Sequence, residues 1–307
     1  MADDEPRPQP GGPEHVMDFA PLHLDHPPAS KKTVWIADLD VHVFGLDEIR
    51  GSDLPIGVVT IAHGWANKAS QMDGMATGVL GEIRRLDREA GGTRRRDVLV
   101  VTMDQRNHGE RRRHRKGNLP FPKNPHRLVD MAVNITSGMA DQTFIYDFLP
   151  IYLFPHGERV IEEWMPCGLS LGGHQTWRLL KSDPRIRLGA PIISIPPELF
   201  GTGFLFKYGE AAGAVPAAYG PALDRFYLLP EGGYEGKKIF CLYGELDMVI
   251  PVEIGLAQLA KNKANAESKP GGLVESYIQK NRGHVITPEM VVLLSAFFHR
   301  HGFARQA

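Results

Sequence analysis

The chain has 307 residues, with 35 lysines and arginines against 36 aspartates and glutamates, so its formal net charge is −1. This balance provides no overall attraction to nucleic acids or to anionic membranes. Two cysteines, Cys167 and Cys241, are too few for a disulfide framework, and both occur in apolar runs typical of buried strands.

The first 31 residues contain seven prolines and show no apolar periodicity. This composition predicts a mostly disordered arm that packs on the domain near Met17 to Leu24. The arm lacks the basic start and apolar run of a secretory signal, and no apolar stretch reaches the roughly 18 residues that span a bilayer. We therefore expect a soluble cytoplasmic protein without a membrane partner.

From residue 32 onward, predicted strands and helices alternate. Residues 32–46 show the pattern of one or two antiparallel edge strands, and 56–64 has the continuous apolar character of a buried parallel strand. A helix is expected over 70–90, where apolar residues recur at helical spacing between a serine and two glycines. The next strand is predicted at residues 97–105.

The second half of the chain continues this alternation. The remaining predicted helices cover 141–154, 172–182, 252–265 and 288–302, and the remaining strands run into 167–170 and over 188–195, 237–244 and 273–280. Two stretches interrupt it, an irregular one at 109–140 and one at 198–236 that is rich in glycine, proline and aromatic residues. The sequence predicts an α/β domain over 32–303, with a mostly parallel sheet of about eight strands, helices on both faces and a small cap at 198–236.

The central motif is Gly168-Leu169-Ser170-Leu171-Gly172, which matches the G-x-S-x-G pattern of a nucleophile elbow. In such an elbow the serine lies on a sharp turn between a strand and a helix, and its backbone angles are strained. Side chains in place of the two glycines would collide with the neighbouring strand or helix. A random match to G-x-S-x-G occurs in roughly one chain in nine of this composition. The assignment of a nucleophile elbow therefore depends on the strand predicted before the motif and the helix predicted after it.

A serine hydroxyl becomes nucleophilic when a base removes its proton, and in this arrangement the acid and the histidine follow the serine along the chain. Asp247 comes after the strand at 237–244 and His284 after the strand at 273–280, so both lie at the carboxyl edge of the sheet. Glu245 is the alternative acid. Less well placed acids and histidines are Asp183, Asp224, His299 and His301.

Acyl transfer also creates an oxyanion, which needs two preorganised hydrogen-bond donors. The backbone N–H of Leu171, directly after the serine, is one candidate. The second is the backbone N–H of Trp65, because Gly64 lets the chain turn towards the site after the strand at 56–62. Taken alone, His63-Gly64 is typical of a plain turn at the end of a strand.

Together these motifs resemble the α/β-hydrolase superfamily across residues 32 to 303, and most of all its dienelactone-hydrolase and prolyl-oligopeptidase-like branches and single-domain fungal hydrolases. The motifs that carry the resemblance are HGW at 63–65, DQRNHG at 104–109, GLSLGGH at 168–174, GELDMVIP at 244–251 and GHVITPEM at 283–290. The chain departs from dienelactone hydrolases, which carry cysteine at the nucleophile, and it lacks the β-propeller of prolyl oligopeptidases.

The resemblance implies Ser170 as nucleophile, Asp247 as acid, His284 as base, and backbone oxyanion donors at Trp65 and Leu171. We therefore expect a cofactor-independent serine hydrolase that cleaves a carboxylic ester in a small-molecule substrate. The first alternative is the same triad acting on a peptide, thioester or carbon–carbon bond or transferring the acyl group, and the second is a non-catalytic ligand-binding protein. Neither metal-ligand spacing nor a nucleotide-binding motif occurs, so no metal, cofactor or nucleic-acid partner is implied.

Polar residues outside the motifs have simpler interpretations. The basic runs Arg94–Arg96 and Arg111–Lys116 lack interleaved aromatic residues and are typical of solvated loop faces. Residues 104–108 are expected to form a turn held by side-chain hydrogen bonds, with Arg106 as an alternative contact for a substrate carboxylate. The aromatic residues of 198–236 are expected either to line an apolar pocket or to pack the cap onto the body.

Overall fold

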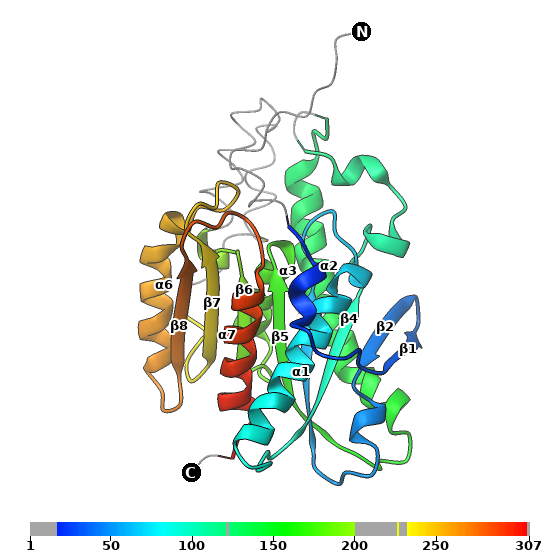
Figure 1. The fold of residues 1–307 in the computed structure, drawn as a ribbon. Coiled ribbons are helices and arrows are strands. Elements are labelled where there is room, and N and C mark those ends of the chain that lie inside the picture. The colour runs from blue at the N-terminus through cyan, green and yellow to red at the C-terminus, as the bar shows by residue number, and fades with distance from the viewer. Residues whose placement is uncertain (1–16, 121–122, 200–225, 227–231, 306–307) are drawn as a thin grey trace.

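A computed structural model describes residues 17–120, 123–199, 226 and 232–305. Its centre is an eight-stranded sheet in the order β1-β2-β4-β3-β5-β6-β7-β8 (Figure 1). The first two junctions, β1 with β2 and β2 with β4, are antiparallel, and all others are parallel. The strands are β1 (Lys31–Ile36), β2 (Leu39–Phe44), β3 (Ile56–Ala62), β4 (Asp97–Met103), β5 (Ile161–Leu169), β6 (Leu188–Ile192), β7 (Lys238–Gly244) and β8 (Leu273–Gln279).

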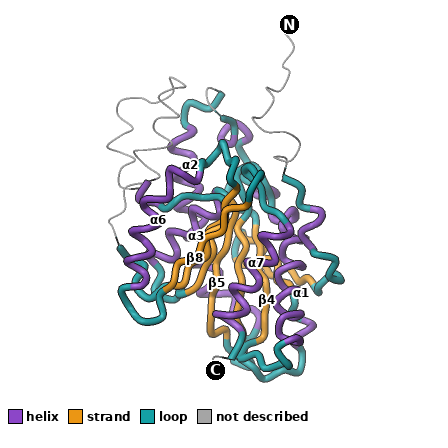
Figure 2. The backbone as a smooth tube through the Cα atoms, turned by 60° about the vertical axis from the view of Figure 1, so that its left-hand side comes forward, coloured by secondary structure: helices purple, strands orange, loops and turns teal. Residues whose placement is uncertain are grey.

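Helices cover both faces of the sheet (Figure 2). The α-helices are α1 (Asp73–Glu89), α2 (Arg127–Leu153), α3 (Leu171–Ser182), α6 (Val252–Glu267) and α7 (Pro288–Phe298). Short helical turns are η2 (Ala20–His23), η3 (Asp47–Ile49), η4 (Ala69–Met72), η5 (Gly109–Arg111), η6 (Arg115–Asn118), η7 (Pro197–Leu199) and η9 (His299–Phe303). Among the described residues, no helix has both the length and the apolar character to cross a bilayer.

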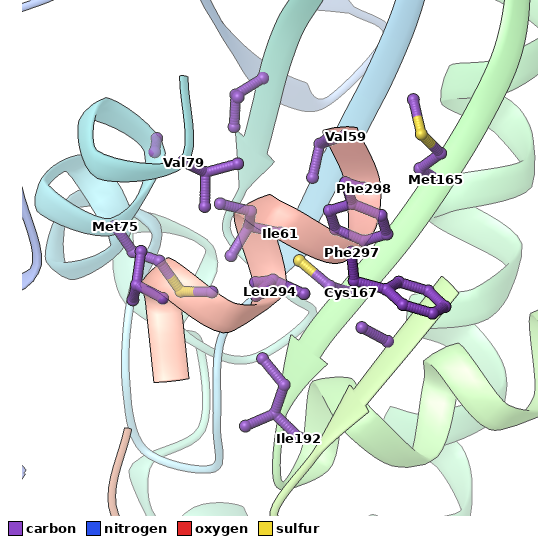
Figure 3. Packing of buried hydrophobic residues seen from close by; sticks show 14 of the residues in the cluster. Val59, Ile61, Met75, Val79, Met165, Cys167, Ile192, Leu294, Phe297 and Phe298 are labelled. Carbon is purple, nitrogen blue, oxygen red and sulfur yellow. The ribbon is translucent and has the colours of Figure 1, made fainter. Parts of the chain in front are cut away.

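Two apolar cores lie on opposite faces of the sheet because successive side chains of a strand point to opposite sides. The first core joins β3, β5 and β6 to α1 and α7, with Ile61, Cys167 and Leu294 among its members (Figure 3). The second core joins the other face to α2, α3 and α6 and includes Trp177 and Cys241. Both cysteines are thus free thiols buried in strands, as predicted, and burial raises their pKa.

The prediction for α2 was wrong at its start. The helix begins at Arg127 rather than at 141, so residues 127–140, which were expected to be irregular, are helical. Leu128, Met131 and Ile135 recur at helical spacing and are all buried, which is the apolar stripe that stabilises these turns. Pro150 lies within the helix near its carboxyl end, and the helix continues to Leu153.

Residues 17–31 are the described part of the predicted arm, and they include the stretch Met17 to Leu24 that was expected to pack on the domain. Leu22 in η2 is fully buried and packs in the core with α1. The close approach depends on Gly78 of α1, where a Cβ atom would lie 2.1 Å from the Leu22 carbonyl oxygen. Residues 1–16 and most of the predicted cap at 198–236 lie outside the described residues.

Candidate active site

The predicted nucleophile lies at the junction of β5 and α3. Strand β5 ends at Leu169, helix α3 begins at Leu171, and Ser170 between them has φ 51° and ψ −105°. This combination is costly for a residue with a side chain and persists only where the surrounding structure imposes it. The Ser170 N–H donates to the Ile192 carbonyl of β6 at 2.9 Å, which ties the turn to the neighbouring strand.

The glycines around Ser170 have the steric role that the sequence predicts. A Cβ atom on Gly168 would lie 2.4 Å from the Gly172 carbonyl carbon, and a Cβ atom on Gly172 would lie 2.2 Å from the Ala62 carbonyl oxygen. Both contacts are with backbone atoms, which cannot move aside as a flexible side chain can. The elbow therefore requires glycine at both positions.

Asp247 and His284 meet at the same edge of the sheet. The Nδ1 atom of His284 lies 2.7 Å from Asp247 Oδ2, and the Asp247 side chain is almost fully buried. The other carboxylate oxygen, Oδ1, accepts the backbone N–H groups of Val249 at 2.9 Å and Ile250 at 2.8 Å. A carboxylate can only accept, so His284 carries its proton on Nδ1, and Nε2 is left with a lone pair that can take a proton.

The first turn of α3 places His174 beside the predicted nucleophile. The N–H of His174 donates to the Ser170 carbonyl at 2.9 Å, so His174 lies one turn from the serine. Burial lowers the pKa of His174 to about 3. Ser170 Oγ forms no hydrogen bond with His284 or with any other described residue. Such bonds are often long before substrate binds.

The two predicted oxyanion donors lie on either side of the elbow. A Cβ atom on Gly64 would be 3.7 Å from Ser170 Cβ, so the loop after β3 lies against the serine. Within the described part of the chain, the backbone N–H groups of Trp65 and Leu171 donate to no protein acceptor. Both donors are therefore available to a developing oxyanion.

The ring of His63 orients the peptide group that carries the Trp65 N–H. Its Nε2 accepts the Gln105 backbone N–H at 3.0 Å, which assigns the ring proton to Nδ1, and Nδ1 donates to the Gly64 carbonyl at 2.8 Å. The N–H of Asn67 donates to the same carbonyl at 3.2 Å. In a trans peptide the carbonyl and the N–H point in opposite directions, so these two bonds fix the direction of the Trp65 N–H.

Sequence analysis assigned no role to the His63 ring. The signal in the sequence that could have found it is a histidine that directly follows a mostly apolar strand; in the structure its side chain is fully buried. Buried polar side chains continue from it: Gln105 donates through Nε2 to the His63 carbonyl, and its Oε1 accepts from Gln175 Nε2 at 2.6 Å. Gln175 Oε1 in turn accepts from Gln142 of α2 at 3.2 Å. A satisfied buried network of this kind holds the loop rigidly.

We predict that replacing His63 with leucine lowers kcat for ester hydrolysis by roughly a hundredfold, because the Trp65 donor loses its fixed direction. KM is expected to change little, since the oxyanion forms after substrate binds. Steady-state kinetics measures both constants, and His108→Leu is the matched control, because its ring contacts Trp65 but not the Gly64 carbonyl. Equal losses of kcat in both variants would indicate general disruption instead.

Other predicted residues have structural partners. Arg106 pairs with Asp141 at 2.9 Å, which is the structural role that the turn predicts. Asp104 accepts the backbone N–H groups of Ala69 at 2.7 Å and Glu110 at 2.8 Å, which is the expected turn held by side chains. The alternative acid Glu245 accepts from the N–H of Asn281 at 3.0 Å, and Asp183 pairs with Arg185 at 2.7 Å. Asp224 lies outside the described residues, among which no group of metal-ligating side chains occurs.

Two buried histidines are expected to make the protein sensitive to acid. Burial lowers the pKa of His63 to about 4 and that of His174 to about 3. In the unfolded chain these rings take up protons below pH about 6.5, whereas in the folded chain they do so only near pH 4 or below. Between these pH values the unfolded state binds more protons, so the free energy of unfolding falls as pH drops from about 6.5 to about 4. Each ring contributes up to about 1.4 kcal/mol per pH unit.

Urea unfolding at pH 7 and pH 5 measures this acid sensitivity. His174→Gln is expected to reduce the difference between the two pH values, whereas the same change at the exposed His156 leaves it as in the wild type. A wild-type protein equally stable at both pH values would contradict the assignment of neutral buried rings.

Comparison with known proteins bears on the fold. Neither a family model nor a curated protein matches the chain. Among solved structures, TT1662 from Thermus thermophilus is 18% identical with a TM-score of 0.57, covering 89% of this chain and 98% of that one. An arylesterase is 10% identical with a TM-score of 0.54, covering 92% and 90%. The Pyrococcus horikoshii acylaminoacyl peptidase is 14% identical with a TM-score of 0.52, and the match covers 90% of this chain but 41% of the peptidase.

These likenesses, together with the strand order, establish the fold. The sheet is mostly parallel, helices lie on both faces, and the chain matches these structures over almost its whole length. The protein has the α/β-hydrolase fold, as its sequence predicts.

Proposed function

We propose that the protein is a serine hydrolase that cleaves a carboxylic ester of a small molecule through an acyl-enzyme intermediate. The observation that carries this proposal is the Asp247–His284 pair, 2.7 Å apart, at the same sheet edge as a serine held at φ 51°. A protein that only binds a ligand needs neither a strained serine nor a histidine oriented by a buried carboxylate.

In the proposed reaction, Ser170 Oγ attacks the ester carbonyl carbon while His284 Nε2 takes its proton. The carbonyl oxygen becomes an oxyanion, which accepts from the N–H groups of Trp65 and Leu171. Collapse of this intermediate breaks the bond to the alcohol, which leaves with the proton from His284. Water then attacks the acyl-enzyme by the same steps and releases the carboxylic acid and the free serine.

The names of the structural neighbours are consistent with this chemistry. They include an arylesterase and acylaminoacyl peptidases, although the sequence identities of 10% and 14% relate these proteins to the chain by fold alone. The peptidase neighbours keep cleavage of an amide bond as a second candidate reaction for the same residues. Substrate profiling with matched esters, thioesters and aminoacyl amides distinguishes these reactions.

The proposal is tested by labelling the folded protein with a fluorophosphonate probe and mapping the labelled peptide. A serine activated by a base forms a covalent adduct with such a probe, whereas an ordinary serine does not. We expect one adduct, on Ser170, and none in Ser170→Ala. Absence of an adduct on a folded wild-type protein would contradict a serine hydrolase and favour the ligand-binding alternative.

A further inference from the structure

The segment between β4 and α2 concentrates positive charge. Residues 109–127 contain seven arginines and lysines but one acidic residue, Glu110, in a chain whose formal net charge is −1. In Figure 1 this segment lies above the carboxyl ends of the parallel strands, beside the first turns of α2. Its cations are Arg111, Arg112, Arg113, Arg115, Lys116, Lys123 and Arg127.

The backbone of this segment is held by side-chain hydrogen bonds. Asn107, at φ 57°, accepts through Oδ1 from the N–H groups of Arg113 at 3.1 Å and His114 at 2.7 Å. Its Nδ2 donates to Asn118 Oδ1 at 2.8 Å, and Asn118 Nδ2 donates back to the Asn107 carbonyl at 2.8 Å. The cations therefore project from a defined loop and keep their spacing.

Most of these cations are not neutralised by an ion pair within the part of the chain that the structure describes. Arg111 pairs with Asp141 at 2.8 Å. The next four cations are exposed and form no ion pair with any residue that the structure describes; they are Arg112, Arg113, Arg115 and Lys116. The carboxylate of Asp104 is already engaged by two backbone N–H groups. Four like charges held on one loop repel each other and produce a positive potential that an anion would relieve.

Trp65 joins this segment to the candidate active site. Its indole Nε1–H donates to the Asn118 carbonyl at 2.9 Å, and the guanidinium carbon of Arg127 lies 3.8 Å from the centre of its ring. Leu128, the next residue of α2, packs in one apolar cluster with Leu171. The segment thus contacts Trp65, whose backbone N–H is one of the two candidate oxyanion donors.

We propose that residues 111–120 and 123–127, here called the basic segment, bind a negatively charged group on the ester that Ser170 attacks. The inference rests on the proposed hydrolase function and names its substrate class: an ester that carries a carboxylate or a phosphate away from the scissile bond. Guanidinium groups bind carboxylates and phosphates well because two of their N–H groups can donate parallel hydrogen bonds to two oxygens of the anion.

The test compares p-nitrophenyl esters that differ only in the charge at the far end of the acyl chain. The carboxylate member of each pair is the mono-p-nitrophenyl ester of a linear dicarboxylic acid from adipic to sebacic acid, and its neutral partner is the corresponding methyl ester. A third series, ending in a phosphate monoester, separates the two anions. The measured quantity is the ratio of kcat/KM for the anionic ester to that for the neutral ester.

We expect a ratio of roughly ten or more for one chain length at low ionic strength, because charged clefts raise the rate of capture of opposite charges about 10- to 1000-fold. Added salt should reduce the ratio, since charges are screened beyond about 10 Å at 0.1 M. The ratio should fall to about two in a variant that changes the four exposed cations, Arg112, Arg113, Arg115 and Lys116, to glutamine, because this removes most of the positive charge that attracts the anion. Any general loss of activity cancels in the ratio.

The matched control changes four exposed cations elsewhere, Lys32, Arg88, Lys263 and Lys269, to glutamine, so the net charge alters equally. It should keep the wild-type ratio. A ratio near one in the wild-type enzyme, or an equal fall in both variants, would overturn the inference while the hydrolase proposal stands. If no ester is hydrolysed, calorimetric binding of suberate to Ser170→Ala with and without the four glutamines still decides whether the segment binds anions.

Discussion

Replacing Ser170 with alanine is expected to lower kcat for ester hydrolysis by roughly 10⁴- to 10⁶-fold, as removal of a nucleophile does in serine hydrolases. The elbow itself should survive, because its geometry depends on the flanking glycines and on the Ser170 N–H bond to Ile192, which alanine keeps. Alanine adopts the strained φ of 51° no more easily than serine does, so stability should change little.

Ser194→Ala is the matched control for this loss. Ser194 is fully buried beside the elbow, and its hydroxyl has no partner among the described residues, so its removal breaks no bond. Initial rates with a p-nitrophenyl ester, together with thermal unfolding, give activity and stability for both variants. Ester hydrolysis by Ser170→Ala within tenfold of the wild-type rate would eliminate Ser170 as nucleophile.

Replacing Asp247 with asparagine is expected to lower kcat by about 10⁴-fold without unfolding the loop. Asparagine keeps one oxygen, which can still accept the N–H groups of Val249 and Ile250. Its amide nitrogen then faces His284 Nδ1 and donates to it, which moves the ring proton to Nε2. A ring protonated there cannot take the proton of Ser170.

The control for this change is Glu245→Gln, which alters the neighbouring acid that bonds to the Asn281 N–H. It should keep most of the activity. Proton NMR of the imidazole N–H groups reports the ring tautomer directly, and kcat with an ester reports its consequence. If Asp247→Asn remained active while Glu245→Gln did not, Glu245 instead of Asp247 would be the acid that orients His284.

Much of the fold could be predicted from the sequence because strand and helix periodicities are local. The runs at 56–62 and 97–103 are buried along their entire length, which is the pattern of strands covered on both faces. Helix α2 was the exception. Its first half has buried residues at helical spacing, but the adjoining basic and proline-containing stretch led to its interpretation as irregular chain.

Within the candidate site, the sequence was informative where chemistry depends on order along the chain. The glycines around Ser170 and the positions of Asp247 and His284 after consecutive strands predicted one shared edge, because parallel strands end on the same side of a sheet. No such rule connects His63 with Gln105, since their contact depends on how two strands and a loop pack. Their hydrogen bond became visible only in three dimensions.

The sequence by itself determined the class of sheet, the position of the strained serine and the choice of candidate acid and base, since these follow from periodicity, glycine sterics and chain order. Only the tertiary structure decided which acid binds His284, which way the Trp65 N–H points and what lies beside Trp65. Those properties depend on contacts between residues far apart in the chain, such as Trp65 with Asn118 and Arg127. Local patterns carry no information about such contacts, because packing of the whole domain selects them.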